Sequence, residues 1–243
     1  MQMIQALILL SLLALSPTSS VDDILNALDA RGQNLTDFSA NVKLSETDSN
    51  TGDTTVTSGE VSFARKPDGE VQMHIHFDKI QRPDGATRPD DRDYVLIDGW
   101  LDERDNLQKT DDKRQIAQPG EKMDLFKLAG PIALPIGQKP EDVKNLFDVK
   151  KVDPAKGDPP NTVHIQLTPI PHTHYAGQFK TIDVWVDCNT NMPCRIETLD
   201  AQETTNKTTD LSNVKLNLGL PSNVFDLPPI PEHGWQQIVE PFK

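Results

Sequence analysis

The feature that most constrains this fold is the alternation of apolar and polar residues, which is clearest in residues 179–199. Side chains two residues apart lie on the same face of a strand, so a regular alternation predicts a half-buried strand. The turn residues 189–193 follow, and the alternation then resumes. The stretch therefore predicts an antiparallel β-hairpin. The residues of its first half that share one face are Ile182, Val184, Val186 and Cys188.

The two cysteines of the chain, Cys188 and Cys194, lie at the inner ends of this hairpin. Both share the parity of the apolar residues, which is where a cross-strand disulfide would lie. Disulfides persist in oxidising compartments, because the cytosol keeps thiols reduced. We expect a Cys188–Cys194 disulfide, with two reduced thiols as the alternative.

The first 20 residues indicate export from the cytosol. An apolar run over residues 6–15 is too short to span a bilayer, and small residues follow it up to Ser20. This pattern is typical of a cleaved signal peptide, and no Lys or Arg precedes the apolar run. A buried N-terminal helix is the alternative. We expect residues 1–20 to be a signal peptide and residues 21–243 to form one soluble, exported domain.

The chain has a formal net charge of −13, which makes nucleic acid and anionic membrane surfaces unlikely partners. Aromatic residues make up only 5% of the sequence, so few large side chains are available to fill an interior. A long curled sheet with so few aromatic residues favours a partly empty apolar cavity.

Near the N-terminus, the spacing of the apolar residues changes from that of a helix to that of a strand. Asp22 or Asp23 is expected to cap a helix, and from Phe38 onwards the apolar residues alternate as in strands. Residues 78–93 are rich in proline and aspartate, so we expect a long, mobile hairpin loop there. Short helices broken by prolines are expected within residues 120–147, where they would form a lid. The predicted fold class is α+β, with a curled antiparallel sheet of about ten strands.

The sequence lacks the common enzyme motifs for nucleophilic serine, phosphate, dinucleotide or zinc-protease chemistry. Two His-x-His pairs have a spacing at which strand residues bind metals: His74 with His76, and His172 with His174. The first pair alternates with an apolar series, so we expect a solvated strand face, and the second follows two prolines and is expected in a loop. We predict no enzyme, catalytic residue, cofactor or metal site. A metal-dependent enzyme is the third hypothesis.

Two further charged groups lie near the predicted strands. The acidic run Asp90, Asp91 and Asp93 lacks the spacing of a calcium loop, so we expect a solvated loop. Arg65 follows the strand at residues 59–64 and continues the parity of its apolar side chains. It is expected to donate hydrogen bonds to backbone carbonyls of the lid, with an ordinary surface arginine as the alternative.

Taken in order, several landmarks resemble the LolA-type periplasmic carriers of outer-membrane lipoproteins. They are the signal peptide, the helix with Leu35-x-x-Phe38-x-Ala40, and the stretches GEVSFARKP, VLIDGWLDE, DVWVDCNTNMPCRIET and NLGLPSNVFDLPPIPEHGW. The resemblance covers residues 21–240 approximately. It implies an incomplete antiparallel β-barrel closed by short helices, with an apolar cavity that takes up the acyl chains of a lipoprotein.

The resemblance also implies a function without catalysis. The protein would be a monomeric carrier that receives acylated lipoprotein or lipid cargo from an inner-membrane release complex and delivers it to an outer-membrane acceptor. A non-transporting envelope sensor or binding module of the same fold is the alternative. By motif Arg65 matches the lid arginine of the family, and Lys66 is the alternative because the motif here is Arg65-Lys66-Pro67.

We expect the following residues to line the acyl cavity or its lid, with ordinary core packing as the alternative for each: Phe38, Val42, Phe63, Met73, Ile75, Phe77, Leu125, Phe126 and Leu128.

Overall fold

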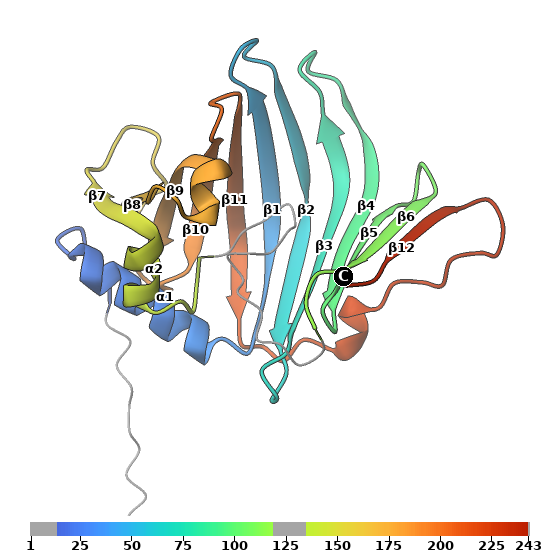
Figure 1. Cartoon of the computed structure of the whole chain (residues 1–243), viewed down its shortest axis with the longest axis horizontal. Helices are drawn as coiled ribbons and strands as arrows, with labels where there is room; N and C mark the ends of the chain where they lie inside the picture. The colour runs from blue at the N-terminus through green and yellow to red at the C-terminus, as the bar shows by residue number, and fades with distance from the viewer. Residues whose placement is uncertain (1–13, 119–134, 243) are drawn as a thin grey trace, which may run out of the picture.

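The computed structural model describes residues 14–118 and 135–242, and its body is one sheet of twelve strands (Figure 1). The strands are β1 (Asp37–Asp48), β2 (Thr54–Arg65), β3 (Val71–Gln81), β4 (Thr87–Ile97), β5 (Trp100–Asp105), β6 (Thr110–Gln115), β7 (Phe147–Val152), β8 (Thr162–Pro169), β9 (Phe179–Asp187), β10 (Pro193–Asp200), β11 (Thr205–Leu216) and β12 (Gln236–Glu240). The helices are α1 (Val21–Asn34) and α2 (Pro140–Leu146), with 3-10 turns η1 (His174–Gly177) and η2 (Ser222–Phe225).

The sheet is open and almost wholly antiparallel. Its order is β12-β6-β5-β4-β3-β2-β1-β11-β10-β9-β8-β7, and only the β12–β6 pair is parallel. The two edge strands, β12 and β7, lie at opposite ends of the curled sheet (Figure 1). The predicted incomplete antiparallel barrel with an N-terminal helix is therefore confirmed, with twelve strands in place of about ten.

Two hairpins form where the sequence predicts them. In the first, Ile196 of β10 pairs with Val184 of β9, and the inner face of β9 is buried. In the second, β4 and β5 are joined by a tight turn. Both turn residues, Asp98 and Gly99, have positive φ (51° and 77°), as a type I′ hairpin turn requires.

The predicted disulfide is wrong, because Cys188 and Cys194 are free thiols in the structure. The pairing of β9 with β10 shifts between Pro193 and Arg195, so Cys194 lies in an irregularity of the ladder. Cys188 is buried in the main core, whereas the Sγ of Cys194 lies 3.4 Å from the carbonyl oxygen of Trp185. Burial raises the pKa of Cys194 to about 11, so this thiol stays protonated at neutral pH.

The prediction of a long hairpin loop at residues 78–93 is right about the hairpin and wrong about the length of its loop. Strand β3 extends to Gln81 and β4 starts at Thr87, so the connection is only residues 82–86. Pairing continues outwards as far as Gln81 opposite Thr87, with a shift between Phe77 and Lys79. The backbone ladder therefore continues where the apolar alternation stops.

Helix α1 is capped by a residue that precedes both expected caps. Ser20 is the N-cap, and its hydroxyl accepts from the Asp23 backbone N–H (3.2 Å) while Asp23 Oδ2 accepts from the Ser20 N–H (2.8 Å). This reciprocal pair is a capping box. Just upstream, Leu15 is 6% exposed and belongs to the main core. Residues assigned to the signal peptide thus pack in the structure, and the boundary at residue 20 stays a prediction.

The main core lies between α1 and one face of the sheet, which we call the inner face. It includes the expected helix stripe, in which Ile24, Leu25 and Leu28 are all buried. The opposite, outer face of β3 to β6 carries the chain after β11, where Phe225 of η2 is 1% exposed. The described residues include no helix long and apolar enough to cross a membrane.

Candidate functional site

The candidate binding site is a cavity of about 380 Å³ between the two helices and the strands β7 to β9. Exposed Asp142 and Asn145 also line it, so it opens to solvent beside α2. Its remaining walls are mainly apolar side chains and rings from α1, α2, β7, β8, β9 and η1: Leu25, Leu28, Pro135, Val143, Leu146, Phe147, Ile165, Leu167, Tyr175 and Val184. An apolar hollow with a polar mouth suits an elongated apolar ligand that carries a polar end.

Local sequence explains why the hollow forms here. Pro140 starts α2 directly after the chain leaves the inner face, and Val143 is the one buried residue of this short helix. Beneath it, β8 presents Ile165 and Leu167, which are 1% and 2% exposed. No large aromatic side chain of β8 faces α1, so the helices rest above the sheet without filling the space between them.

The cavity residues predicted from β1, β2 and β3 are in the main core. All six are buried, and none of them lines the cavity. The rings of Phe38 and Phe63 stack on each other with centroids 5.4 Å apart, and Phe77 meets Tyr94 edge to face. They pack within the main core, and a role in ligand binding stays a prediction for Phe38, Val42, Phe63, Met73, Ile75 and Phe77. The other three, Leu125, Phe126 and Leu128, lie outside the described residues.

Arg65 points towards the chain segment that enters α2. A Cβ added to Gly137 would lie 4.0 Å from Arg65 Nη2 and only 3.4 Å from the Cα of Gly32. The N–H of Gly137 also donates to the carbonyl oxygen of Leu28 in α1 (3.2 Å). The guanidinium therefore lies where α1, the end of β2 and the start of the α2 segment converge.

Lys66 has a different environment. Its Nζ lies 3.0 Å from Glu70 Oε2 and 3.5 Å from Asp98 Oδ1, both in the neighbouring turns. Hydrogen bonding to Glu70 raises the pKa of Lys66. Of the two candidates for the lid position, the structure brings only Arg65 to the α2 segment.

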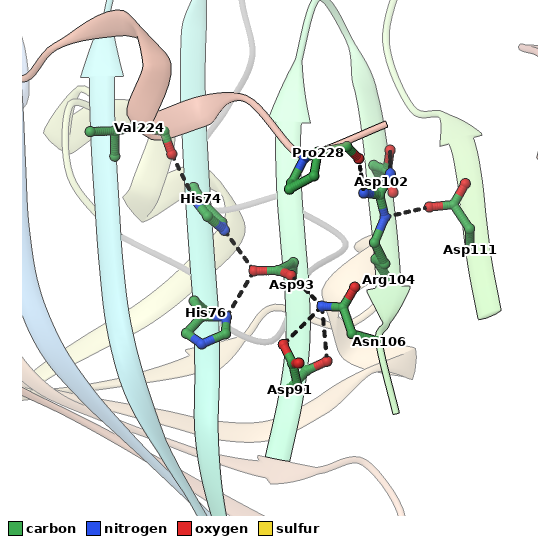
Figure 2. A network of polar contacts seen from close by, with 10 residues as sticks. All are labelled: His74, His76, Asp91, Asp93, Asp102, Arg104, Asn106, Asp111, Val224 and Pro228. Carbon is green, nitrogen blue, oxygen red and sulfur yellow. Dashed lines mark hydrogen bonds and ion pairs between the residues drawn. The ribbon is translucent and has the colours of Figure 1, made fainter. Parts of the chain in front are cut away.

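The outer face carries a polar network that the sequence analysis did not anticipate (Figure 2). His74 and His76 point away from the main core, as predicted, but they are not simply solvated. Both histidines contact the same oxygen, Asp93 Oδ1, at 2.8 and 2.9 Å. Asn106 Nδ2 donates to Asp93 Oδ2 (2.9 Å) and to Asp91 Oδ1 (2.8 Å). The expectation of a solvated acidic loop is wrong for Asp93, which lies on β4 and is 7% exposed.

His76, Asp91 and Asp93 offer ligand atoms that lie within 4.8 Å of one another. The Asn106 amide, however, donates hydrogen bonds to both carboxylates. Because these oxygens already accept hydrogen bonds, the geometry is that of a hydrogen-bonded cluster rather than of a metal site.

A second cluster on the same face joins β5, β6 and the chain after η2. Arg104 Nε donates to Asp111 Oδ1 (3.0 Å), and its Nη1 donates to the carbonyl oxygen of Pro228 (2.6 Å). The guanidinium also lies 5.9 Å from the ring centre of Trp235. Burial and the neighbouring Asp111 raise the pKa of Asp102 to about 6.

No protein-family model and no curated protein matches this chain. Among solved structures, it is similar to an uncharacterized conserved protein from Thermus thermophilus, with a TM-score of 0.51 and 10% identity. That match covers 91% of this chain and 100% of the other. At this identity the likeness shows the fold alone, which is the same over almost the whole of both chains.

Two other similarities have TM-scores below 0.5 and say nothing about function. A chain of the MucA/MucB complex of Pseudomonas aeruginosa matches with a TM-score of 0.46 and 15% identity over 85% of this chain. This chain spans only 60% of the length of that one. A LolA superfamily protein from Nitrosomonas europaea matches with a TM-score of 0.37 and 12% identity, over 86% of this chain and 98% of the other.

Proposed function

We propose that this protein binds an acyl chain of a lipid or lipoprotein in the cavity under α1 and α2. The proposal rests on one observation, the apolar hollow of about 380 Å³ that opens beside α2. Removing an acyl chain from water is favourable by about 0.8 kcal/mol per methylene, so even partial insertion stabilises the complex. The polar head of the ligand would remain at the mouth, near Asp142 and Asn145.

We further propose that the protein is an exported, periplasmic carrier that delivers this cargo to the outer membrane without catalysing a reaction. The LolA-type landmarks in the sequence support the export and the route, including an inner-membrane release complex and an outer-membrane acceptor as partners. Reversible binding is compatible with the open mouth of the cavity and with the short helix that forms one wall.

Filling the cavity tests the binding site. Val143→Trp places a large ring inside the hollow, so we expect the affinity for a fluorescent long-chain fatty acid to fall at least tenfold. Val149→Trp is the matched control, because Val149 is partly buried on β7 but does not line the cavity. Both variants are first checked for an unchanged circular dichroism spectrum. Equal affinities in the two variants would place the ligand elsewhere.

Transfer distinguishes a carrier from a sensor. The loaded protein is mixed with vesicles that contain an outer-membrane acceptor fraction, and the labelled lipopeptide is followed from protein to vesicle. A carrier releases the lipopeptide only when the acceptor is present. Binding without any transfer would support the non-transporting sensor or binding module and remove the carrier proposal.

A further inference from the structure

We propose that His74 is held as an imidazolium that fastens residues 222–235, here called the C-terminal strap, to the outer face of the sheet. Loss of its proton as the pH rises then loosens the strap. This device lies on the opposite side of the sheet from the acyl cavity, so it does not depend on the proposed function.

The contacts of His74 require an N–H donor on each of its two ring nitrogens. Its Nδ1 lies 2.7 Å from the carbonyl oxygen of Val224 in the strap, and its Nε2 lies 2.8 Å from Asp93 Oδ1 (Figure 2). A carbonyl and a carboxylate only accept hydrogen bonds, and a neutral imidazole has a single N–H. Only the imidazolium donates to both partners at once.

The proton belongs to His74 rather than to Asp93. Burial raises the pKa of Asp93, but hydrogen bonds from His74, His76 and Asn106 more than offset this and lower it. Burial likewise lowers the pKa of His74, and its bonds to Asp93 and Val224 outweigh that effect and raise it. The carboxylate is therefore ionised, and the imidazole is the group that carries the proton.

Several ionisable groups lie around His74, and we compare them by whether they bond to the strap. Asp93 faces it from β4, and His76 lies on the same strand and face. Glu60 of β2 is opposite His76 in the ladder, and the opposite residue to His74 on that strand is Ser62. From the strap, the nearest ionisable residue along the chain is Asp226, which is exposed. Within this set, only His74 bonds to a strap atom.

The strap has a second anchor that does not titrate. Arg104 Nη1 donates to the Pro228 carbonyl oxygen, and a guanidinium stays protonated over the whole working range of pH. Between these two anchors, Phe225 is 1% exposed. Deprotonation of His74 therefore loosens the part of the strap around Val224 and Phe225, while Arg104 keeps the part around Pro228 in place.

The direction of the pH effect follows from the raised pKa of His74. The bond to Val224 is fully present below the ordinary histidine value of 6.5 and is lost as the pH rises through the higher value of the folded state. The strap is thus tightest below pH 6.5 and becomes looser as the pH rises through the raised pKa of His74.

Nuclear magnetic resonance on the full chain tests this. The ring signals of His74 and the amide signals of Val224 and Phe225 are followed from about pH 5.5 to about pH 9, a range that brackets the titration of histidine. We expect one shared midpoint above 6.5, and protection of the two amides from exchange, corrected for intrinsic rates, to fall about tenfold across it. A midpoint of His74 at or below 6.5, or strap signals that do not move with it, would overturn the proposal.

Variants separate the clamp from the rest of the cluster. His74→Gln should remove the shared step and leave the strap loose at all pH values. His76→Gln is the matched control, because His76 binds the same carboxylate oxygen without touching the strap, and the step should persist. Asp93→Asn should lower the midpoint of His74, since the charged acceptor is lost. A strap transition unchanged in His74→Gln would also overturn the proposal.

Discussion

At the scale of single residues, burial decides how charges on the outer face behave. Asp102 lies beside Asp111, and the cations Arg104 and Lys113 also act on it. Burial and the second carboxylate make ionisation of Asp102 unfavourable, whereas the cations favour it. The net result is a pKa of about 6 against an ordinary 3.8, so the folded state binds a proton more tightly than the unfolded chain.

The raised pKa of Asp102 predicts how the stability of the fold changes with pH. Because the folded-state pKa is raised, the Asp102 contribution falls as the pH rises from about 4 to about 6 and is level above that. Asp102→Asn removes the cost of ionisation, so we expect the free energy of unfolding to rise by about 1–2 kcal/mol at about pH 8, and by less at about pH 5. Urea denaturation at both pH values measures this. Asp148→Asn, at an exposed carboxyl on β7, is the control and should change little. A loss of stability at the higher pH would contradict the assignment.

Replacing Gly32 of α1 by alanine should change stability in the direction opposite to the one that helix propensity predicts. In an isolated helix, Gly→Ala is stabilising by about 1 kcal/mol. Here an added Cβ would lie 2.3 Å from the Cα of Gly137, so the helix and the α2 segment must separate. We expect Gly32→Ala to destabilise the fold by about 1–3 kcal/mol in thermal or urea unfolding.

The neighbouring position provides the control for this change. Gln33→Ala lies one residue along the same helix on its exposed side and should leave stability within about 0.5 kcal/mol. If Gly32→Ala were as stable as the natural chain, the close contact between α1 and Gly137 would be wrong.

At the scale of elements, the sequence predicts strands wherever one face is apolar. The alternation identifies β9 and the inner residues of β3, because burial on one side leaves a period of two. It fails for residues 78–93, where both faces of the ribbon are polar or partly exposed. Proline has no backbone N–H to donate to a neighbouring strand. Pro89 is tolerated in β4 because the pairing with β5 ends at Arg92, so no β5 strand lies beside it.

The disulfide prediction failed for a related reason. Parity along two strands indicates a shared face only when the ladder between them is regular. The shift between Pro193 and Arg195 breaks that condition, and turn residues alone do not reveal such a shift. The capping box at Ser20, by contrast, has a local signal: a serine followed three residues later by an acidic side chain.

At the scale of the whole molecule, the existence of a cavity was predictable but its position was not. Sparse aromatic residues and a long curled sheet favour an incompletely filled interior, and the structure has a hollow on the inner face. Its walls, however, come from α1, α2 and strands more than 100 residues later in the chain than α1. Such long-range packing leaves no periodic signal. The residues chosen from β1 to β3 are apolar for a different reason, since they pack on one another.

The polar clusters on the outer face also could not be predicted from the sequence. His74, Asp93 and Arg104 come from three strands, and each interacts with a neighbour on another strand or with the strap. Their spacing in the sequence shows which face of its strand each side chain lies on, but not which residues it contacts. The network becomes evident only when the register brings the strands together and η2 covers them (Figure 2).

The central claim is that the inner-face cavity holds an acyl chain, and native mass spectrometry tests it most directly. The purified full chain is measured alone, with a tri-acylated lipopeptide, and with the same peptide without acyl chains. We predict a one-to-one adduct with the acylated peptide only, which weakens in Val143→Trp and persists in Val149→Trp. Absence of any adduct with the acylated peptide, or equal adducts with both peptides, would contradict the claim.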